Sequence, residues 1–290
     1  MKKKIIIVSI LIILVVVLLL IPKDVYGKIF KKNKNNEPKI EENLVYQTMY
    51  VKSMNKYLVG VKVGVKALEE DVVSQKWDIL TKDVSLIPSG YSSPIALSTT
   101  LLSHEVKDGV LTLNVSEDFL SSEGRLAIEC LAWNFCNDEV KEIVVKINDE
   151  KINEVNNYYF QKISKAMGVN LTYDTIDIFQ ANYVTITHYE GDVIKPVTYF
   201  YQSNLNQYEY VIKKVLTKDE SLKELVMAKK YKYELKDKGL VISFDYSEQI
   251  SDNIINTFKE TFKDYDDLVS LTINGTDTVL LELDFKEVSE

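Results

Sequence analysis

The segment KDGVLTLNVSEDF occupies residues 107–119, and DKGLVISFDYSEQI occupies residues 237–250. Each starts with a charged turn that contains a glycine and continues as a strand of alternating apolar residues. In each, the strand is followed by Ser-Glu, a pair typical of a helix start. The elements around both segments follow one order: strand, strand, helix, strand, strand, helix, strand. Since few residues are identical between the copies, this shared order predicts a tandem duplication of one α+β unit.

We expect each copy to be a small sheet-plus-two-helix domain, with both helices on one face of the sheet. Ser116 and Ser247 are predicted to be the N-caps of the second helix in their copies, and the first of these helices is predicted to run to about Asn137. The extended run DTVLLELDF, residues 277–285, has no expected counterpart in the first copy.

The N-terminus differs in composition from the rest of the chain. Three lysines precede IIIVSILIILVVVLLLI, residues 5–21, which contains no charge. This run is close to the ~20 apolar residues that cross a bilayer as a helix. The small-residue cleavage pattern of a secretory signal peptide is missing after it. We therefore expect residues 1–22 to be an uncleaved transmembrane signal anchor that contacts the lipid bilayer through residues 5–21.

Charge is divided unevenly along the chain. Residues 1–40 carry nine lysines against Asp24 and Glu37, a net charge of +7, so the total of −8 leaves −15 on residues 41–290. An acidic body repels nucleic-acid phosphates, and we expect no nucleic-acid partner. The lysines flanking the anchor would place the body in the cytoplasm, but long domains translocate largely regardless of charge. We expect a single-pass protein of the cell membrane with an extracytoplasmic C-terminal body.

These patterns divide the chain into five expected parts. A polar stretch rich in lysine and asparagine follows the anchor and is typical of a linker. The parts are the anchor (1–22), a basic linker (23–42), a first domain (43–150), a connector (151–182) and a divergent second domain (183–290).

The first copy resembles the GerMN domain of the GerM family of sporulation and spore-germination proteins. The resemblance lies in LIPSGYSSPIALSTTLLSHEVKDGVLTLNVSEDF, residues 86–119, in the apolar helix that follows, and in VKEIVVKIND, residues 140–149. It covers residues 44–150 well and residues 183–285 in outline. It implies two tandem GerMN-like domains behind a membrane attachment. Members are commonly lipoproteins, whereas this chain has no cysteine before Cys130.

One predicted helix carries more apolar surface than a single packing face needs. On a helical wheel for residues 126–136, one apolar side faces a sheet, while Ile128, Ala132 and Phe135 fall on the other side. The helix could be wedged between the sheet and the helix formed by residues 71–80. Alternatively, these three residues are a candidate interaction surface for a partner.

We expect no catalytic, cofactor or metal site, and therefore no enzyme. His104 and His188 are the only two histidines and lie in different copies. HExxH, CxxC, GxSxG and P-loop patterns do not occur. The acidic pair Glu117 and Asp118 is explained by the positive end of a helix dipole. Cys130 and Cys136 are too far apart on a helix for a disulfide, which indicates two small apolar core residues.

Two hypotheses on function follow. The first is a membrane-anchored, extracytoplasmic assembly or scaffold protein of the cell envelope, which contacts another envelope protein or copies of itself through two tandem modules. The family resemblance implies sporulation or spore germination as its setting. The second is a module that binds peptidoglycan or regulates a wall hydrolase. It predicts an exposed aromatic groove that draws on the eighteen tyrosines.

Overall fold

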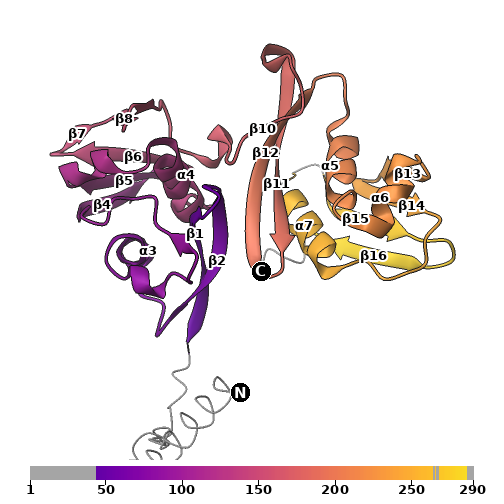
Figure 1. Cartoon of the computed structure of the whole chain (residues 1–290), viewed down its shortest axis with the longest axis horizontal. Coiled ribbons are helices and arrows are strands. Elements are labelled where there is room, and N and C mark those ends of the chain that lie inside the picture. The colour runs from indigo at the N-terminus through magenta and orange to yellow at the C-terminus, as the bar shows by residue number, and fades with distance from the viewer. Residues whose placement is uncertain (1–43, 264, 266–267, 286–290) are drawn as a thin grey trace, which may run out of the picture. The chain divides into compact units, whose positions relative to one another are not determined.

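The computed structural model describes residues 44–263, 265 and 268–285, which belong to one compact unit (Figure 1). The expected anchor, residues 1–22, and the expected linker, residues 23–42, lie outside the described residues. Within the part that is described, no helix is both long enough and apolar enough to span a membrane.

The first copy has a hydrophobic core of its own. The alternating apolar residues predicted as strands form strands, and the apolar helix is present. Its elements are β1 (Val45–Ser53), β2 (Leu58–Val65), α3 (Val72–Thr81), β3 (Tyr91–Ser92), β4 (Leu101–Lys107), β5 (Val110–Val115), α4 (Gly124–Phe135), β6 (Glu142–Ile147) and β7 (Glu150–Lys151).

The second copy has a separate core and repeats the order with one additional helix. Its elements are β11 (Ala181–Glu190), β12 (Val193–Gln202), α5 (Gln207–Leu216), α6 (Glu220–Met227), β13 (Tyr231–Lys236), β14 (Gly239–Phe244), α7 (Asp252–Phe262), β15 (Ser270–Asn274) and β16 (Val279–Asp284). The additional helix α6 was not predicted. It begins because the Asp219 side chain accepts hydrogen bonds from the backbone N–H groups of Ser221 and Leu222.

Each copy contains a four-stranded sheet with the same topology. The strand orders are β4-β5-β6-β7 and β13-β14-β15-β16. In both sheets the second and third strands are parallel, joined by α4 in one copy and by α7 in the other, and all other pairs are antiparallel. The run predicted to be extra forms β16, whose counterpart in the first copy is the two-residue strand β7.

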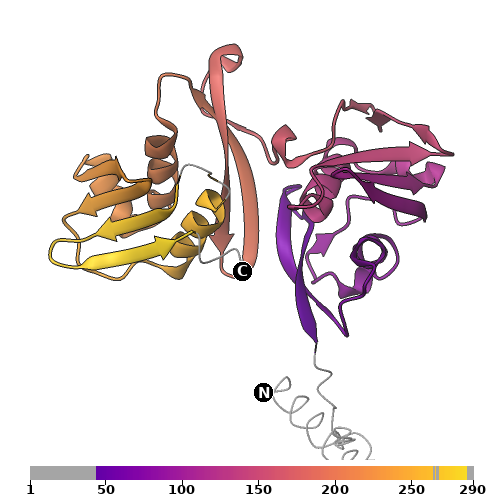
Figure 2. The same cartoon turned by 180° about the vertical axis from the view of Figure 1, so that it is seen from behind.

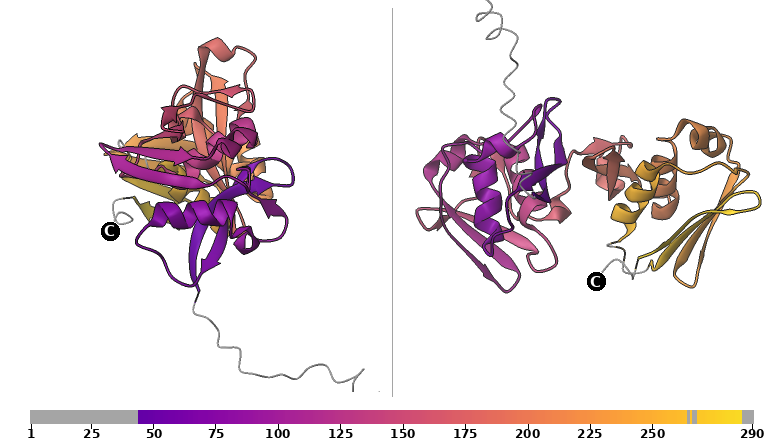
Figure 3. Two further views of the ribbon diagram at one scale, coloured as in Figure 1. Left: turned by 90° about the vertical axis from the view of Figure 1, so that its left-hand side faces the viewer. Right: turned by 90° about the horizontal axis from the view of Figure 1, so that it is seen from below.

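The opening hairpins lie outside these sheets, so the expected single sheet with helices on one face is wrong. In the second copy, α5 and α7 lie between the β11–β12 hairpin and the β13–β16 sheet (Figures 1 and 3). The first copy repeats this layering, as the reverse view also shows (Figure 2). The reason is that these helices have contacts for two layers. In α7, for example, Phe258 belongs to the second core, while Thr257 and Thr261 bond strand β11.

The two second helices begin later than predicted. Ser116 is followed by a 3₁₀ turn, Glu117–Ser121, and α4 starts only at Gly124. Ser247 likewise precedes a loop, and Ser251 is the N-cap residue of α7. The Ser116 hydroxyl instead accepts the Thr100 backbone N–H. A Ser-Glu pair after a strand therefore marked the end of the strand, while the helix started about two turns later in α4 and about one turn later in α7.

The predicted connector, residues 151–182, contributes to the first core. It contains short strands and 3₁₀ turns: β8 (Glu154–Val155), β9 (Tyr158–Tyr159), η3 (Lys165–Met167), β10 (Thr172–Tyr173) and η4 (Ile178–Gln180). Val155, Ile163 and Val169 are buried with the residues of the first copy. The first core therefore extends along the chain beyond residue 150.

Helix α7 covers one edge of strand β11 through a row of polar side chains. Asn253, Thr257 and Thr261 lie four residues apart, about 6 Å per step along a helix, which matches the ~6.8 Å spanned by two residues of a strand. The bonds run from Thr187 N–H to Thr261 Oγ1 (3.2 Å), from Tyr189 N–H to Thr257 Oγ1 (3.1 Å) and from Gly191 N–H to Asn253 Oδ1 (3.2 Å). In the first copy, Asn134 of α4 bonds both backbone groups of Tyr50 in β1.

Replacing both threonines of this row should destabilise the chain. Thr257→Val and Thr261→Val keep the side-chain shape but remove the acceptors, which leaves buried N–H groups unpaired. We expect each substitution to lower the free energy of unfolding by about 1–3 kcal/mol, measured by urea denaturation. Thr278→Val, at an exposed position, is the control and should change stability by less than about 0.5 kcal/mol. Equal losses of stability for all three variants would contradict the view that the Thr257 and Thr261 hydroxyls stabilise the edge of β11.

Asn170 joins the opening hairpins of the two copies. Its Nδ2 donates to the carbonyl oxygens of Leu58 and Pro196, both at 2.7 Å, and its Oδ1 accepts from Leu58 N–H at 2.9 Å. Strands β2 and β12 meet nearby, where Ile194 is paired with Gly60. The φ angle of Asn170 is +47°, a region that asparagine tolerates better than most residues.

Asn170→Asp should be destabilising in a pH-dependent manner. The new carboxylate would face two carbonyl oxygens in a buried site, so its pKa in the folded protein would be raised. The destabilisation should therefore grow as the pH rises above ~3.9, the ordinary pKa of Asp, and reach roughly 2–4 kcal/mol at pH 7. Urea denaturation at pH 4.5 and 7.5 measures it. The exposed Asn55→Asp is the control, and equal pH dependence of the two variants would disprove the proposed role.

Candidate interaction surface

The three residues predicted as an interaction surface are buried. Ile128 and Ala132 are fully buried and Phe135 is 4% exposed, all within the first core. The Phe135 ring lies 6.4 Å from the ring of Trp77 on α3. The prediction that these residues form an interaction surface is therefore wrong. They are core residues of a helix wedged between the sheet and α3, the other explanation for the apolar surface of this helix.

Exposed apolar side chains gather instead around β10 and the start of β11. Ile176 is fully exposed and Phe179 is 95% exposed, which is unusual for such large apolar groups. We call this surface the aromatic patch. Its members are Tyr173, Ile176, Ile178, Phe179, Tyr183 and Phe200.

Three rings of the patch stack across neighbouring strands. Phe200 of β12 is directly opposite both Tyr173 of β10 and Tyr183 of β11. Its ring centroid lies 5.0 Å from that of Tyr173, with 20° between the ring planes, and 5.9 Å from that of Tyr183, with 37°. Alternate residues of β12, Tyr199 and Tyr201, belong to the second core. The stack therefore stands on the face of the hairpin that points away from that core.

This stacking decides which ligands the patch suits. Both faces of the central Phe200 ring are turned toward its neighbours, whereas each tyrosine ring keeps its outer face, its edge and its hydroxyl group for contact. The loop side chains of Ile176 and Phe179 extend the apolar area. Aromatic residues with a polar tip beside exposed aliphatic groups are typical of protein–protein contact surfaces.

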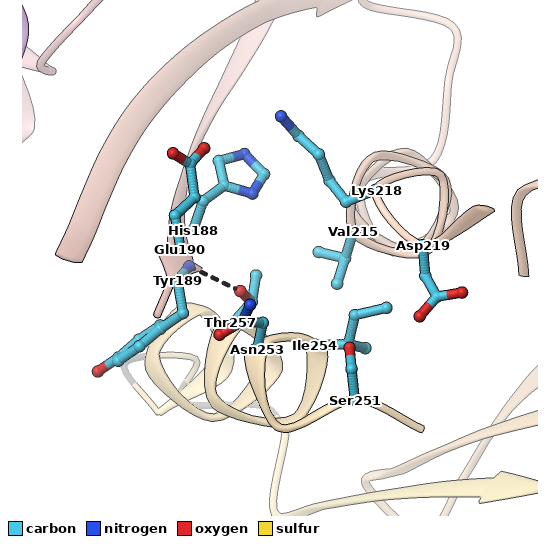
Figure 4. Close-up of a pocket in the computed structure, with 10 residues that line it drawn as sticks. All are labelled: His188, Tyr189, Glu190, Val215, Lys218, Asp219, Ser251, Asn253, Ile254 and Thr257. Carbon is cyan, nitrogen blue, oxygen red and sulfur yellow. Dashed lines mark hydrogen bonds between the residues drawn. The ribbon is translucent and has the colours of Figure 1, made fainter. Parts of the chain in front are cut away.

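A cavity of about 240 Å³ lies on the other side of the same hairpin, between β11, the end of α5 and the start of α7 (Figure 4). His188, Glu190, Lys218 and Asp219 reach it. His188 Nε2 lies 2.9 Å from the Tyr199 hydroxyl. Among the described residues, the His188 ring makes no hydrogen bond to a carboxylate or a serine, so this cavity lacks the geometry of a nucleophile activated by a base.

Burial, together with the neighbouring charges of Lys218, Lys195 and Lys214, lowers the pKa of His188 to about 4. The imidazole is therefore neutral in the folded protein near pH 7. Protonation on unfolding, where the pKa is ~6.5, makes acid favour the unfolded chain.

We expect His188 to cause part of any acid destabilisation. Because its folded-state pKa is depressed, its contribution is present above pH 6.5 and is lost as the pH falls toward about 4. The loss between pH 7 and pH 4.5 is roughly 2–3 kcal/mol. His188→Gln keeps hydrogen-bonding capacity without titrating, so the pH dependence of its unfolding free energy should be smaller by this amount. Identical pH profiles for the variant and the wild type would show that the residue does not titrate as described.

The other residues weighed for chemistry have structural partners. His104 Nε2 contacts Asp71 Oδ2 at 2.9 Å, beside the N-terminus of α3. The Ser74 backbone N–H, the Ser74 side chain and His104 hold the pKa of Asp71 at about 2. Cys130 and Cys136 are buried free thiols. Across the described ranges, no three His, Cys, Asp or Glu side chains form a group that could hold a metal ion.

The aromatic patch was missed in the sequence because four of its six residues lie in the predicted connector, residues 151–182. TYDTIDIFQANY, residues 172–183, alternates too irregularly to predict a strand, so the exposure of Ile176 and Phe179 could not be derived from it. The available signal was two large apolar residues beside Asp174 and Asp177, a composition typical of a loop.

Comparisons with known proteins support the fold. No protein-family profile matches the sequence, and no curated protein matches it significantly. Among solved structures, the chain is similar to the tandem GerMN domains of the sporulation protein GerM from Bacillus subtilis, with 16% identity, 81% of this chain and 92% of that chain covered, and a TM-score of 0.66. The first GerMN domain of the same protein gives 17% identity, 40% and 92% coverage, and a TM-score of 0.37.

An identity this low shows the fold alone. The tandem duplication predicted from the repeated element order is confirmed, and so is the predicted resemblance to two tandem GerMN domains. The described chain has the tandem GerMN-domain fold.

Proposed function

We propose that this chain is a non-enzymatic assembly protein of the cell envelope that binds another protein, or a further copy of itself, through the aromatic patch. The observation that carries this proposal is the exposure of Ile176 and Phe179 beside the stacked rings. Apolar surface gains about 25 cal/mol for each Å² removed from water, so covering these side chains favours association.

The proposed setting combines sequence and fold. Residues 5–21 would hold the chain in the membrane, with the body outside the cytoplasm, and their uncharged run supports this. The fold is similar to that of GerM, a sporulation protein, and this supports a role in sporulation or spore germination. Two tandem units would give two places for contact and thereby raise avidity.

Binding of peptidoglycan, or regulation of a wall hydrolase, is the second candidate function. The exposed tyrosines of the patch favour it, since an exposed aromatic groove was its prediction. Tyr173 and Tyr183 each keep one ring face turned away from Phe200, on which a sugar ring could stack, and Phe179 offers a further open ring face. The fully exposed aliphatic side chain of Ile176 in the same patch favours a protein partner over a glycan.

A crosslinking experiment tests the proposal in intact cells of the source organism. A photo-activatable amino acid at position 179 of the full chain should crosslink to one envelope protein or to a second copy, identified by mass spectrometry. The same group at Met54, which is 86% exposed and outside the patch, is the control. Crosslinks to glycan alone would support the wall-binding alternative. Equal crosslinking at positions 179 and 54 would contradict the proposal that the aromatic patch is the binding surface.

The matched substitution measures the strength of the contact. Ile176→Ser with Phe179→Ser should weaken the captured complex at least about tenfold, as expected for truncated hot-spot residues. It should leave the unfolding free energy within about 0.5 kcal/mol, because both side chains are exposed. Met54→Ser should change neither quantity. An unchanged affinity in the double variant would contradict the proposal.

A further inference from the structure

The second copy carries a hollowed surface lined by lysines and tyrosines. Two adjoining hollows, of about 440 Å³ and 320 Å³, share Lys229, Tyr231 and Lys232. We call them together the lysine groove. Its principal residues come from α5, from the turn between α6 and β13, and from β13 itself: Lys213, Lys229, Lys230, Tyr231, Lys232 and Tyr233.

The acidic groups of the groove are already engaged. Glu209 lies 2.5 Å from Lys213, so these two charges compensate each other. The other acid, Asp245, accepts a hydrogen bond from the neutral Thr276 hydroxyl at 2.7 Å and keeps its negative charge, so one carboxylate faces the remaining lysines of the groove. Within the described part of the chain, Lys229, Lys230 and Lys232 are exposed and form no ion pair. They therefore form a positive cluster on a body whose net charge is negative.

The turn that presents the lysines is fixed by the end of helix α6. Lys229 has φ of +53°. The N–H of Lys229 donates to the carbonyl of Val226, and the N–H of Lys230 donates to that of Leu225. This pairing closes the C-terminus of the helix in the manner of a Schellman motif. The two lysines are thus held beside Tyr231 at the start of an edge strand.

The first copy shows that the fold does not require this cluster. The hairpins β4–β5 and β13–β14 can be superposed at their turns, where Lys107 pairs with Val110 in one copy and Lys236 pairs with Gly239 in the other. Counting back from Lys107 and Lys236, Ser103 and His104 of β4 correspond to Lys232 and Tyr233 of β13. Lysines often protect exposed strand edges from unwanted pairing, but β4 is an edge strand of the same type. It folds without such a cluster, so edge protection does not account for the lysines.

We infer that the lysine groove binds a linear polyanion with phosphate groups. Lysine is a point charge that suits phosphate oxygens, and the Tyr231 hydroxyl is an additional donor, whereas the Tyr233 hydroxyl is bonded to Glu209. Two connected hollows fit a chain that lies along the surface better than a single small ion or a flat bilayer. This site shares no residue with the aromatic patch and does not rest on the proposed function.

The test uses the full chain in a neutral detergent and a fluorescently labelled inorganic polyphosphate, with binding measured by anisotropy. Lys229→Gln, Lys230→Gln and Lys232→Gln together should weaken binding at least about tenfold. They should also reduce the slope of log affinity against log salt by about 2, since each neutralised phosphate contributes ~0.7 for a single strand. Circular dichroism verifies that the triple variant is folded.

The control removes the same charge elsewhere. Lys56→Gln, Lys107→Gln and Lys151→Gln lie at exposed positions of the first copy and should change the affinity less than about twofold. Equal weakening in both triple variants would mean that net charge alone attracts the polymer, and this would disprove the lysine groove as the binding site. Failure of the wild-type chain to bind polyphosphate would also disprove it.

Competition decides the class of ligand. Inorganic phosphate and polyglutamate should displace the labelled polymer only at much higher concentrations than unlabelled polyphosphate. Displacement by polyglutamate at lower concentration would assign the groove to an acidic protein segment and overturn the phosphate assignment. Mixed micelles with phosphatidylglycerol, compared with phosphatidylcholine micelles, test a lipid surface in the same way. Preference for the anionic micelles would also overturn it.

Discussion

The structure depends on the covering of strand edges by helix side chains. A β-hairpin has two edges of unpaired N–H and C=O groups, and a buried edge without partners costs free energy. In the second copy, Thr257 and Thr261 supply hydroxyl acceptors at the helix spacing that matches the strand. In the first copy, one amide, that of Asn134, bonds both backbone groups of Tyr50. The helices can pack against the hairpins because the backbone N–H and C=O groups at these strand edges have hydrogen-bond partners.

The duplicated architecture separates what the fold requires from what each copy has acquired. Both copies keep the parallel strand pair joined by a buried helix and the antiparallel hairpin beside it. The lysine groove occurs on the second copy and has no equivalent at the aligned positions of β4. Asn170 links the two hairpins through three short hydrogen bonds, which fixes the register at which the copies meet. Shared elements thus serve packing, while the differing surfaces are available for partners.

Several features were predicted correctly because they depend on neighbours in the chain. The turns at Gly109 and Lys238, the alternating strands and the apolar helices follow from local periodicity. The helix starts were misplaced because Ser116 and Ser247 satisfy only a local pattern, whereas tertiary contacts decide where the helix begins. Ile128 and Phe135 were weighed as a surface because a helical wheel cannot show that a second layer covers them.

The sequence by itself determined the repeated order of elements, the alternation of buried and exposed residues, and the division of charge between the N-terminus and the body. The reason is that these properties rest on residue type and short-range spacing. Tertiary structure alone decided that α5 and α7 lie between two sheet layers and that Phe200 lies between two tyrosine rings. It also decided that Lys213 lines one groove together with lysines beyond residue 228. Such contacts join residues on different strands and helices, whose distances no local pattern specifies.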